Sequence, residues 1–185
     1  MVDEIADHRA RFETFCRSLS PEELARDVPE SEWQVQDYIA HLATIDQTVT
    51  RWFAALAAGE RPPGGSEGGE GQRFDIDRWN NGQVERRRGL SVDELLSEAA
   101  DKRAQLLTVM ERLSDEVVDG DIYFPGDAHR PPMNLKLEHY LVGWAKHDPI
   151  HVGDMLRALP ERQSDPELTN WLEQSRISSW PPRLA

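Results

Sequence analysis

The feature that most constrains the fold is a stripe of apolar residues at helical spacing over residues 34–58. Its members recur at intervals of three and four: Val35, Tyr38, Ile39, Leu42, Ile45, Val49, Trp52, Phe53 and Leu56. At about 100° per residue they fill one stripe roughly 120° wide, which is the pattern of a long amphipathic helix. Such a helix is stable only when its apolar stripe packs against other elements.

Three further segments carry the same pattern, and together they predict an all-α fold. Long helices are expected over 2–19, 91–113 and 134–159, with shorter pieces from Pro21, over 75–88 and from Pro166. Ser91 and Glu94 have the spacing of a capping box, which marks a helix start. The longest strand-like run, residues 121–124, is only four residues long. Four amphipathic helices with substantial connections predict a four-helix bundle.

Length and charge restrict the organisation and the partners. The 185 residues suit one domain over 1–185, with a flexible Gly/Pro-rich loop at 59–72 and a C-terminal extension at 160–185. The net charge of −13 repels phosphate backbones and anionic lipids, so we expect no nucleic-acid and no membrane partner. No apolar run approaches the roughly 20 residues of a membrane span, and no signal-peptide pattern is present. A cytoplasmic protein is therefore expected.

Three histidines on apolar helix faces are the candidate site. His41 lies beside the stripe of the second long helix, and His147 and His151 lie on or at the edge of the stripe of the fourth. Each alone could pair with a carboxylate or a carbonyl. Together, a pair spaced i, i+4 and a third histidine are the minimum set for a divalent metal ion with an open position.

Two other histidines and one proline affect whether these three residues can form one site. His139 falls outside the apolar stripe and is expected to face solvent, whereas His8 lies on the inner face of the first helix and is a rival ligand. Pro149 lies between the paired histidines and leaves two alternatives. A kinked continuous helix keeps the pair together, and we favour it because the stripe keeps its phase from Leu137 to Met155. A new helix starting at Asp148 and Pro149 would separate the pair.

The residues around the histidines resemble a known family. Residues 32–42 (EWQVQDYIAHL) resemble the DinB-like superfamily signature of a tryptophan followed by a helix with the first metal histidine. His147-x-x-x-His151 resembles the paired ligands of that family, and the likeness covers about residues 1–160. Residues 74–113 resemble the subset related to mycothiol-dependent maleylpyruvate isomerases. Asp154 stands where the family often has a glutamine.

The resemblance implies a site for zinc, or alternatively nickel, held by His41, His147 and His151, often in a homodimer. It also implies an enzyme that transfers a low-molecular-weight thiol such as mycothiol to an electrophilic small molecule. The metal could lower the pKa of the thiol or activate water for hydrolysis, and the resemblance favours the thiol. The longer isomerases carry a further C-terminal domain, so isomerase activity is less expected. The alternative is a non-catalytic metal-binding or stress-associated bundle.

Several residues are secondary candidates. Asp37, Asp148 and Asp154 could each hold the second nitrogen of a ligand histidine, or could simply be solvated. Arg51 and the arginines at 86–88 could recognise an acidic thiol or substrate. Cys16, the only cysteine, lies on the apolar stripe of the first helix and is expected in the core rather than as a nucleophile.

Overall fold

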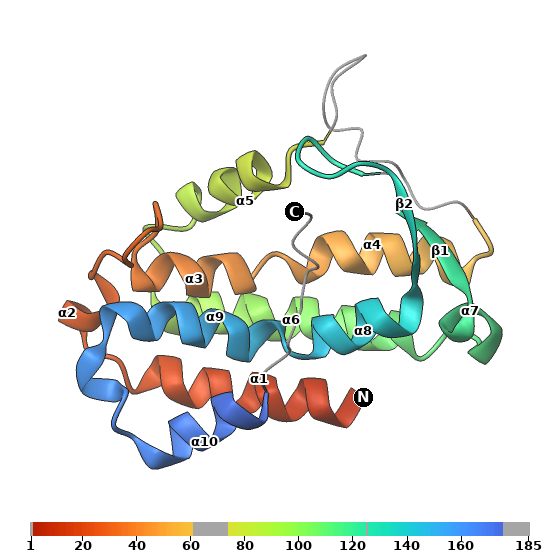
Figure 1. Cartoon of the computed structure of the whole chain (residues 1–185). Coiled ribbons are helices and arrows are strands. Elements are labelled where there is room, and N and C mark those ends of the chain that lie inside the picture. Colours follow the sequence, from red (N-terminus) through yellow and green to blue (C-terminus); the bar gives the residue numbers. More distant parts are fainter. Residues whose placement is uncertain (1, 61–73, 125, 176–185) are drawn as a thin grey trace. The chain divides into compact units, whose positions relative to one another are not determined.

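The computed structural model describes residues 2–60, 74–124 and 126–175, and most of these residues are helical (Figure 1). The elements are α1 (Val2–Arg17), α2 (Pro21–Leu24), α3 (Val35–Leu42), α4 (Asp46–Ala57), α5 (Ile76–Glu85), α6 (Val92–Met110), α7 (Asp115–Asp119), β1 (Asp121–Phe124), β2 (Met133–Lys136), α8 (Leu137–Ala145), α9 (His147–Met155) and α10 (Pro166–Gln174). Two 3₁₀ turns, Leu156–Ala158 and Pro160–Arg162, precede α10. Most of the predicted loop at 59–72 and the end of the extension lie outside the described residues. No helix in the described ranges is both long and apolar enough to cross a membrane.

Local capping chemistry begins three of the helices where the sequence predicts it. Ser20 and Ser91 each accept a hydrogen bond from the backbone N–H of the glutamate three residues later, and that glutamate bonds back to the serine N–H. Asp165 accepts hydrogen bonds from two backbone N–H groups in the first turn of α10. These side chains satisfy donors that have no partner within the helix. The predicted starts of α2, α6 and α10 are confirmed.

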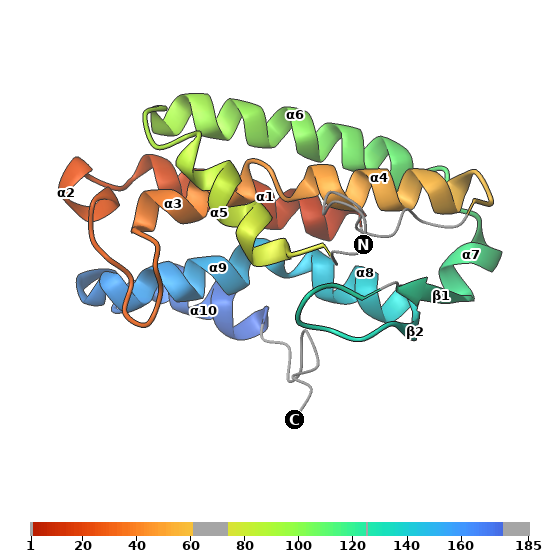
Figure 2. The ribbon, with the colours of Figure 1, turned by 90° about the horizontal axis from the view of Figure 1, so that it is seen from above.

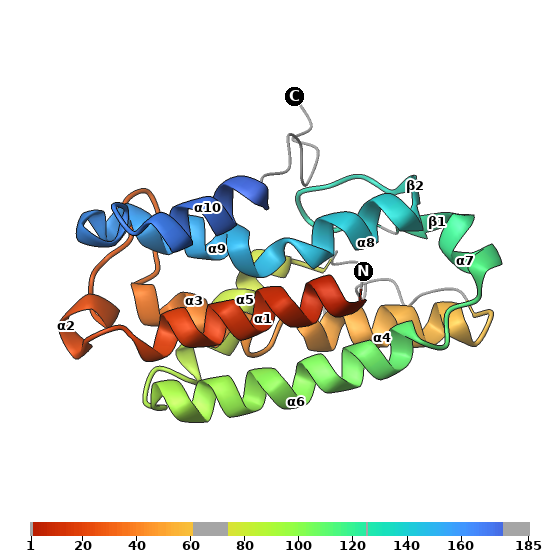
Figure 3. The ribbon, with the colours of Figure 1, turned by 90° about the horizontal axis from the view of Figure 1, so that it is seen from below.

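The chain divides into two compact units, of which the first comprises residues 1–39 and 141–185. Within it α9 packs against both α1 and α10, as Figures 1 and 3 show. Its fully buried apolar side chains include Ile5, Phe12, Val152, Met155 and Leu159. The apolar stripes of α1 and α9 therefore form the core of this unit.

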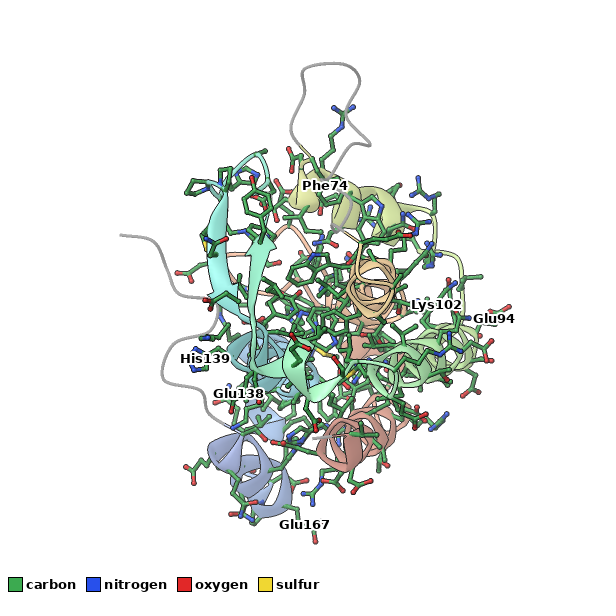
Figure 4. The ribbon with its side chains drawn as sticks, turned by 90° about the vertical axis from the view of Figure 1, so that its right-hand side faces the viewer. Phe74, Glu94, Lys102, Glu138, His139 and Glu167 are labelled. Carbon is green, nitrogen blue, oxygen red and sulfur yellow. The ribbon has the colours of Figure 1, made fainter. Side chains whose placement is uncertain are left out.

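The second unit comprises residues 40–140, and within it α4 packs along α6 (Figure 2). Its fully buried apolar side chains include Phe53, Leu95, Leu96, Ala99 and Leu106. A buried ion pair also joins the two helices, because Nε of Arg103 donates to Oδ2 of Asp46 at 2.6 Å. Figure 4 shows Glu94 and Lys102 pointing outward from α6, as expected for its polar face.

The predicted continuous helix over 34–58 is wrong, because residues 43–45 form turns that separate α3 from α4. The hydroxyl of Thr44 donates to the carbonyls of Ala40 and His41, at 3.3 and 3.0 Å. Such bonds compete with the backbone ladder and bend helices. The apolar stripe persists across the interruption, which is why periodicity alone did not reveal it.

The predicted helix over 134–159 is also divided. It begins three residues late, because Met133–Lys136 pairs with Asp121–Phe124 as an antiparallel hairpin. It then breaks at Lys146, whose φ of −101° and ψ of 10° are not helical. The favoured alternative is correct in keeping His147, Pro149 and His151 on one helix, but the interruption falls at Lys146, so that helix is not continuous with α8. The alternative of a new helix starting at Asp148 and Pro149 is wrong. Pro149 falls in the first turn of α9, where a backbone N–H has no helical partner to lose.

Candidate metal centre

The structure brings His147 and His151 together on one face of α9. Their Nε2 atoms lie 3.2 Å apart, and the two rings meet nearly edge to face at an interplanar angle of 84°. Two histidine ligands about 2.0–2.1 Å from a tetrahedral zinc ion have their nitrogens about 3.3 Å apart. The donor set and its separation therefore fit two coordination positions of one ion.

Asp154 selects the tautomer of His151 that a metal ion needs. Nδ1 of His151 lies 3.0 Å from Oδ2 of Asp154, one turn further along α9. An ionised carboxylate can only accept, so the proton of the neutral imidazole sits on Nδ1. Nε2 is then left with a lone pair that faces His147. Asp154 thus holds the second nitrogen of His151, one of the two roles considered for it.

Aromatic rings from two helices hold the histidine pair in place. Trp144 of α8 stacks on His147, with ring centroids 4.5 Å apart and an interplanar angle of 12°. Tyr38 of α3 packs against His151 at 5.5 Å, and Trp33 meets the Tyr38 ring edge-on. These contacts restrict the rotation of both imidazoles. Both histidines have intermediate burial, so neither is sealed in the core.

The other two acidic candidates have different roles. Asp148 is 1% exposed and forms an ion pair with Arg9 of α1, so it is not solvated. Asp37 is buried and accepts a hydrogen bond from the backbone N–H of Gln34 at 3.0 Å, which supports the start of α3. Sequence reasoning missed Arg9 because its partner lies 139 residues away.

The other three candidate histidines lie on α3, α8 and α1. His41 is buried in the last turn of α3 and belongs to the second unit. His139 is exposed on α8, as predicted, and points away from it in Figure 4. Nδ1 of His8 accepts a hydrogen bond from Nε1 of Trp171 at 2.8 Å, and burial lowers the pKa of this histidine. His8 therefore anchors α10 rather than offering a free pair of nitrogens.

Most candidate groups for anion recognition and nucleophilic attack are engaged or buried. Arg87 forms two 2.8 Å bonds with Glu98, and Arg88 pairs with Glu85. These arginines stabilise α5 and α6 within the second unit. Cys16 is 1% exposed, and burial raises the pKa of its thiol, which confirms its prediction as a core residue.

An exposed cluster that the sequence did not indicate lies in the second unit. Asp75 and Asp77, at the start of α5, and His129, in the loop between the strands, offer ligand atoms within 4.8 Å of one another. Nε2 of His129 lies 3.4 Å from an oxygen of each carboxylate. Exposed acidic groups often lie together without an ion, so this cluster by itself does not indicate a metal site.

Comparison with known proteins agrees with the fold. The model of the DinB superfamily matches residues 4–155. Two crystal structures of mycothiol-dependent maleylpyruvate isomerase are similar, one with a TM-score of 0.62 at 14% identity. The other, a histidine-to-alanine variant, has a TM-score of 0.61 at 13% identity. Each alignment covers 83% of this chain and 58% of the isomerase, so the chain spans little more than half of that protein's length. No curated protein matches significantly.

Proposed function

Because this chain belongs to the DinB superfamily, we propose that it is a metal-dependent enzyme that transfers a low-molecular-weight thiol to an electrophilic small molecule. The family assignment and the similar structures confirm the all-α, DinB-like fold that the sequence predicts. The observation that carries the proposal is the His147–His151 pair, whose Nε2 atoms lie 3.2 Å apart on α9. Mycothiol is the thiol we propose, because both similar structures are described as mycothiol-dependent.

We propose His41 as the third ligand, on two grounds. It lies within residues 32–42, the segment that resembles the first metal-binding helix of the family. In addition, it follows Tyr38 by three residues on α3, and residues at this spacing share a helix face. Since Tyr38 packs against His151, the face that carries His41 is a suitable source of a third nitrogen. Three histidines on a tetrahedral ion leave one position for a substrate.

The side chains around the pair have defined roles in this proposal. Zinc is the proposed ion, with nickel as the alternative, and when bound it supplies a Lewis acid that lowers the pKa of a thiol. Asp154 keeps the proton of His151 on Nδ1, and Trp144 fixes the plane of His147. Both imidazoles are thereby oriented before any ligand arrives, which reduces the entropic cost of binding.

A thiol-dependent isomerisation is the second activity to be tested. The two similar structures are described as maleylpyruvate isomerase, not as a transferase. The alignment covers 58% of that protein, so its activity is a proposal for this chain and is tested beside transfer to an electrophile.

The deciding experiment compares zinc-loaded and nickel-loaded protein in two assays. One follows conjugation of mycothiol to 1-chloro-2,4-dinitrobenzene, and the other follows isomerisation of maleylpyruvate. We expect thiol consumption to require the metal and to persist in the exposed control His139→Ala. In His147→Ala we expect the rate to fall by about a hundredfold or more, because the metal site is lost. A metal-loaded protein that accelerates neither reaction would instead favour the non-catalytic metal-binding alternative.

The expected surroundings of the enzyme are part of the same proposal. We propose that it acts on small molecules in the cytoplasm and that it forms a homodimer. Light scattering coupled to size-exclusion chromatography tests the dimer directly, and a mass near 21.1 kDa would contradict it.

A further inference from the structure

A buried ion pair joins α1 to the helix that carries both candidate ligands of the first unit. Nε and Nη2 of Arg9 donate to Oδ2 and Oδ1 of Asp148, at 2.9 and 3.0 Å. Arg9 is 5% exposed and Asp148 is 1% exposed. Two parallel bonds of this kind fix the direction as well as the distance of the partner. Asp148 directly follows His147, so the constraint acts within the turn that carries this histidine.

An ion pair is a costly way to hold two helices together. Removing both charges from water costs several kcal/mol per ion, about as much as the pair regains, and apolar residues of similar volume often stabilise a core at least as well. Packing between α1 and α9 therefore does not require these charges. What the bidentate pair adds is a defined orientation of the α9 backbone relative to α1.

The first turn of α9 follows a residue that is not helical. Lys146 has a φ of −101° and a ψ of 10°, so α8 ends at Ala145 and α9 begins at His147. Pro149 has no N–H to donate within that turn. The bond from Ile150 N–H to the Lys146 carbonyl, at 3.1 Å, is the first one of the new helix. A side-chain bond from this turn to α1 therefore adds a restraint on its rotation about the helix axis.

We propose that Arg9 is a positioning residue for the metal-binding histidines. By holding Asp148, Arg9 sets the rotation of the first turn of α9, and with it the 3.2 Å separation of the two Nε2 atoms. Trp144 and Asp154 then fix the individual rings. This inference rests on the proposed metal centre, because it assigns Arg9 a role only toward the ion that the histidines would bind.

The test is a Co²⁺ titration of the full chain, followed by the visible absorption of the bound ion and by competition for its Kd. Two variants are compared with wild type. Arg9→Lys keeps the positive charge but loses the two parallel N–H donors of the guanidinium group. The double variant Arg9→Met with Asp148→Leu removes both charges. Arg162→Lys is the matched control, because Arg162 makes the same bidentate contact with Glu23 in the same unit, at 2.6 and 2.9 Å. Urea unfolding of every variant measures stability separately.

We expect the Kd for Co²⁺ to rise about tenfold or more in both Arg9 variants, with a changed visible band, as for other residues that orient metal ligands. The Arg162→Lys control keeps the wild-type Kd and band even though it loses stability. A folded double variant with the wild-type Kd and band would overturn the inference. If the double variant does not fold, a wild-type Kd and visible band in Arg9→Lys would overturn the inference. A wild-type protein without a Co²⁺ band would overturn the metal centre itself, and this inference with it.

Discussion

Nδ1 of His151 lies 3.0 Å from the carboxylate of Asp154, while Nε2 of the same ring faces His147 at 3.2 Å. One nitrogen of the His151 ring therefore contacts the Asp154 carboxylate, and the other faces the His147 ring. This arrangement makes Asp154 an orienting group for the His151 ring, and that role can be measured.

Replacing Asp154 separates its orienting role from its charge. Asp154→Ala removes the acceptor for the Nδ1 proton, so we expect zinc affinity to fall about tenfold to a hundredfold. Asp154→Gln keeps an acceptor oxygen without the charge and is expected to retain most of the affinity. Competition with a chromophoric chelator measures both constants. Equal affinity of Asp154→Ala and wild type would show that the carboxylate does not orient His151.

The contact between Trp171 and His8 predicts a loss of stability in mild acid. The native state keeps His8 neutral, because burial lowers its pKa below the ordinary value of 6.5 more than nearby Glu4, Asp7 and Asp148 raise it. Below about pH 6.5 the unfolded chain therefore binds a proton that the native state does not, and the free energy of unfolding falls as the pH drops toward the native pKa.

His8→Gln tests this linkage, because glutamine can accept the indole N–H but does not titrate. Urea unfolding at pH 7.5 and at pH 5.0 compares the two proteins. We expect the decrease between these pH values to be smaller in His8→Gln than in wild type. An identical decrease in both proteins would assign the acid sensitivity to other groups.

A second linkage operates at lower pH, between Glu23 and Arg162. The Arg162 guanidinium lowers the pKa of Glu23 from 4.5 to about 2 in the native state. The stabilisation is complete above pH 4.5 and is lost as the pH falls through the window from 4.5 to about 2. In Arg162→Gln we expect lower stability at neutral pH and a flatter dependence across that window. Parallel curves for the two proteins in urea unfolding would contradict this linkage.

The buried pair between Asp46 and Arg103 predicts a large effect in the second unit. Arg103→Met leaves the Asp46 carboxylate, which is 0% exposed, without its guanidinium partner. Breaking a buried pair in this way costs about 3–5 kcal/mol of unfolding free energy. The double variant Arg103→Met with Asp46→Leu is expected to recover most of the loss. A loss below about 1 kcal/mol in Arg103→Met would show that the pair is solvated.

The parts of the fold that depend on local chemistry could be predicted from the sequence. The caps at Ser20, Ser91 and Asp165 involve residues within one turn, so their spacing alone predicted the helix starts. The spacing of His147 and His151 likewise predicted their proximity, because both stay within one helix. The strand-like character of residues 121–124 was also evident from the local sequence.

The parts of the fold that depend on partners distant in the sequence could not be predicted. Met133–Lys136 forms a strand only because Asp121–Phe124 pairs with it, so the sequence pattern assigned its end to a helix. The breaks at Thr44 and Lys146 leave the apolar stripes in phase. The periodicity of apolar residues therefore does not reveal these breaks. Arg9 looked like an ordinary helix residue, and only the folded chain shows that Asp148 is its partner.

The metal content of the purified, tag-free protein is the most direct test of the central claim. Mass spectrometry of zinc and nickel is carried out on wild type, on His147→Ala and on His139→Ala as the exposed control. We predict about one ion per chain in wild type and His139→Ala, and little or none in His147→Ala, because loss of one of three ligands disrupts the site. Absence of metal from wild type, persisting after incubation with zinc, would contradict the account and leave the histidine pair a structural contact.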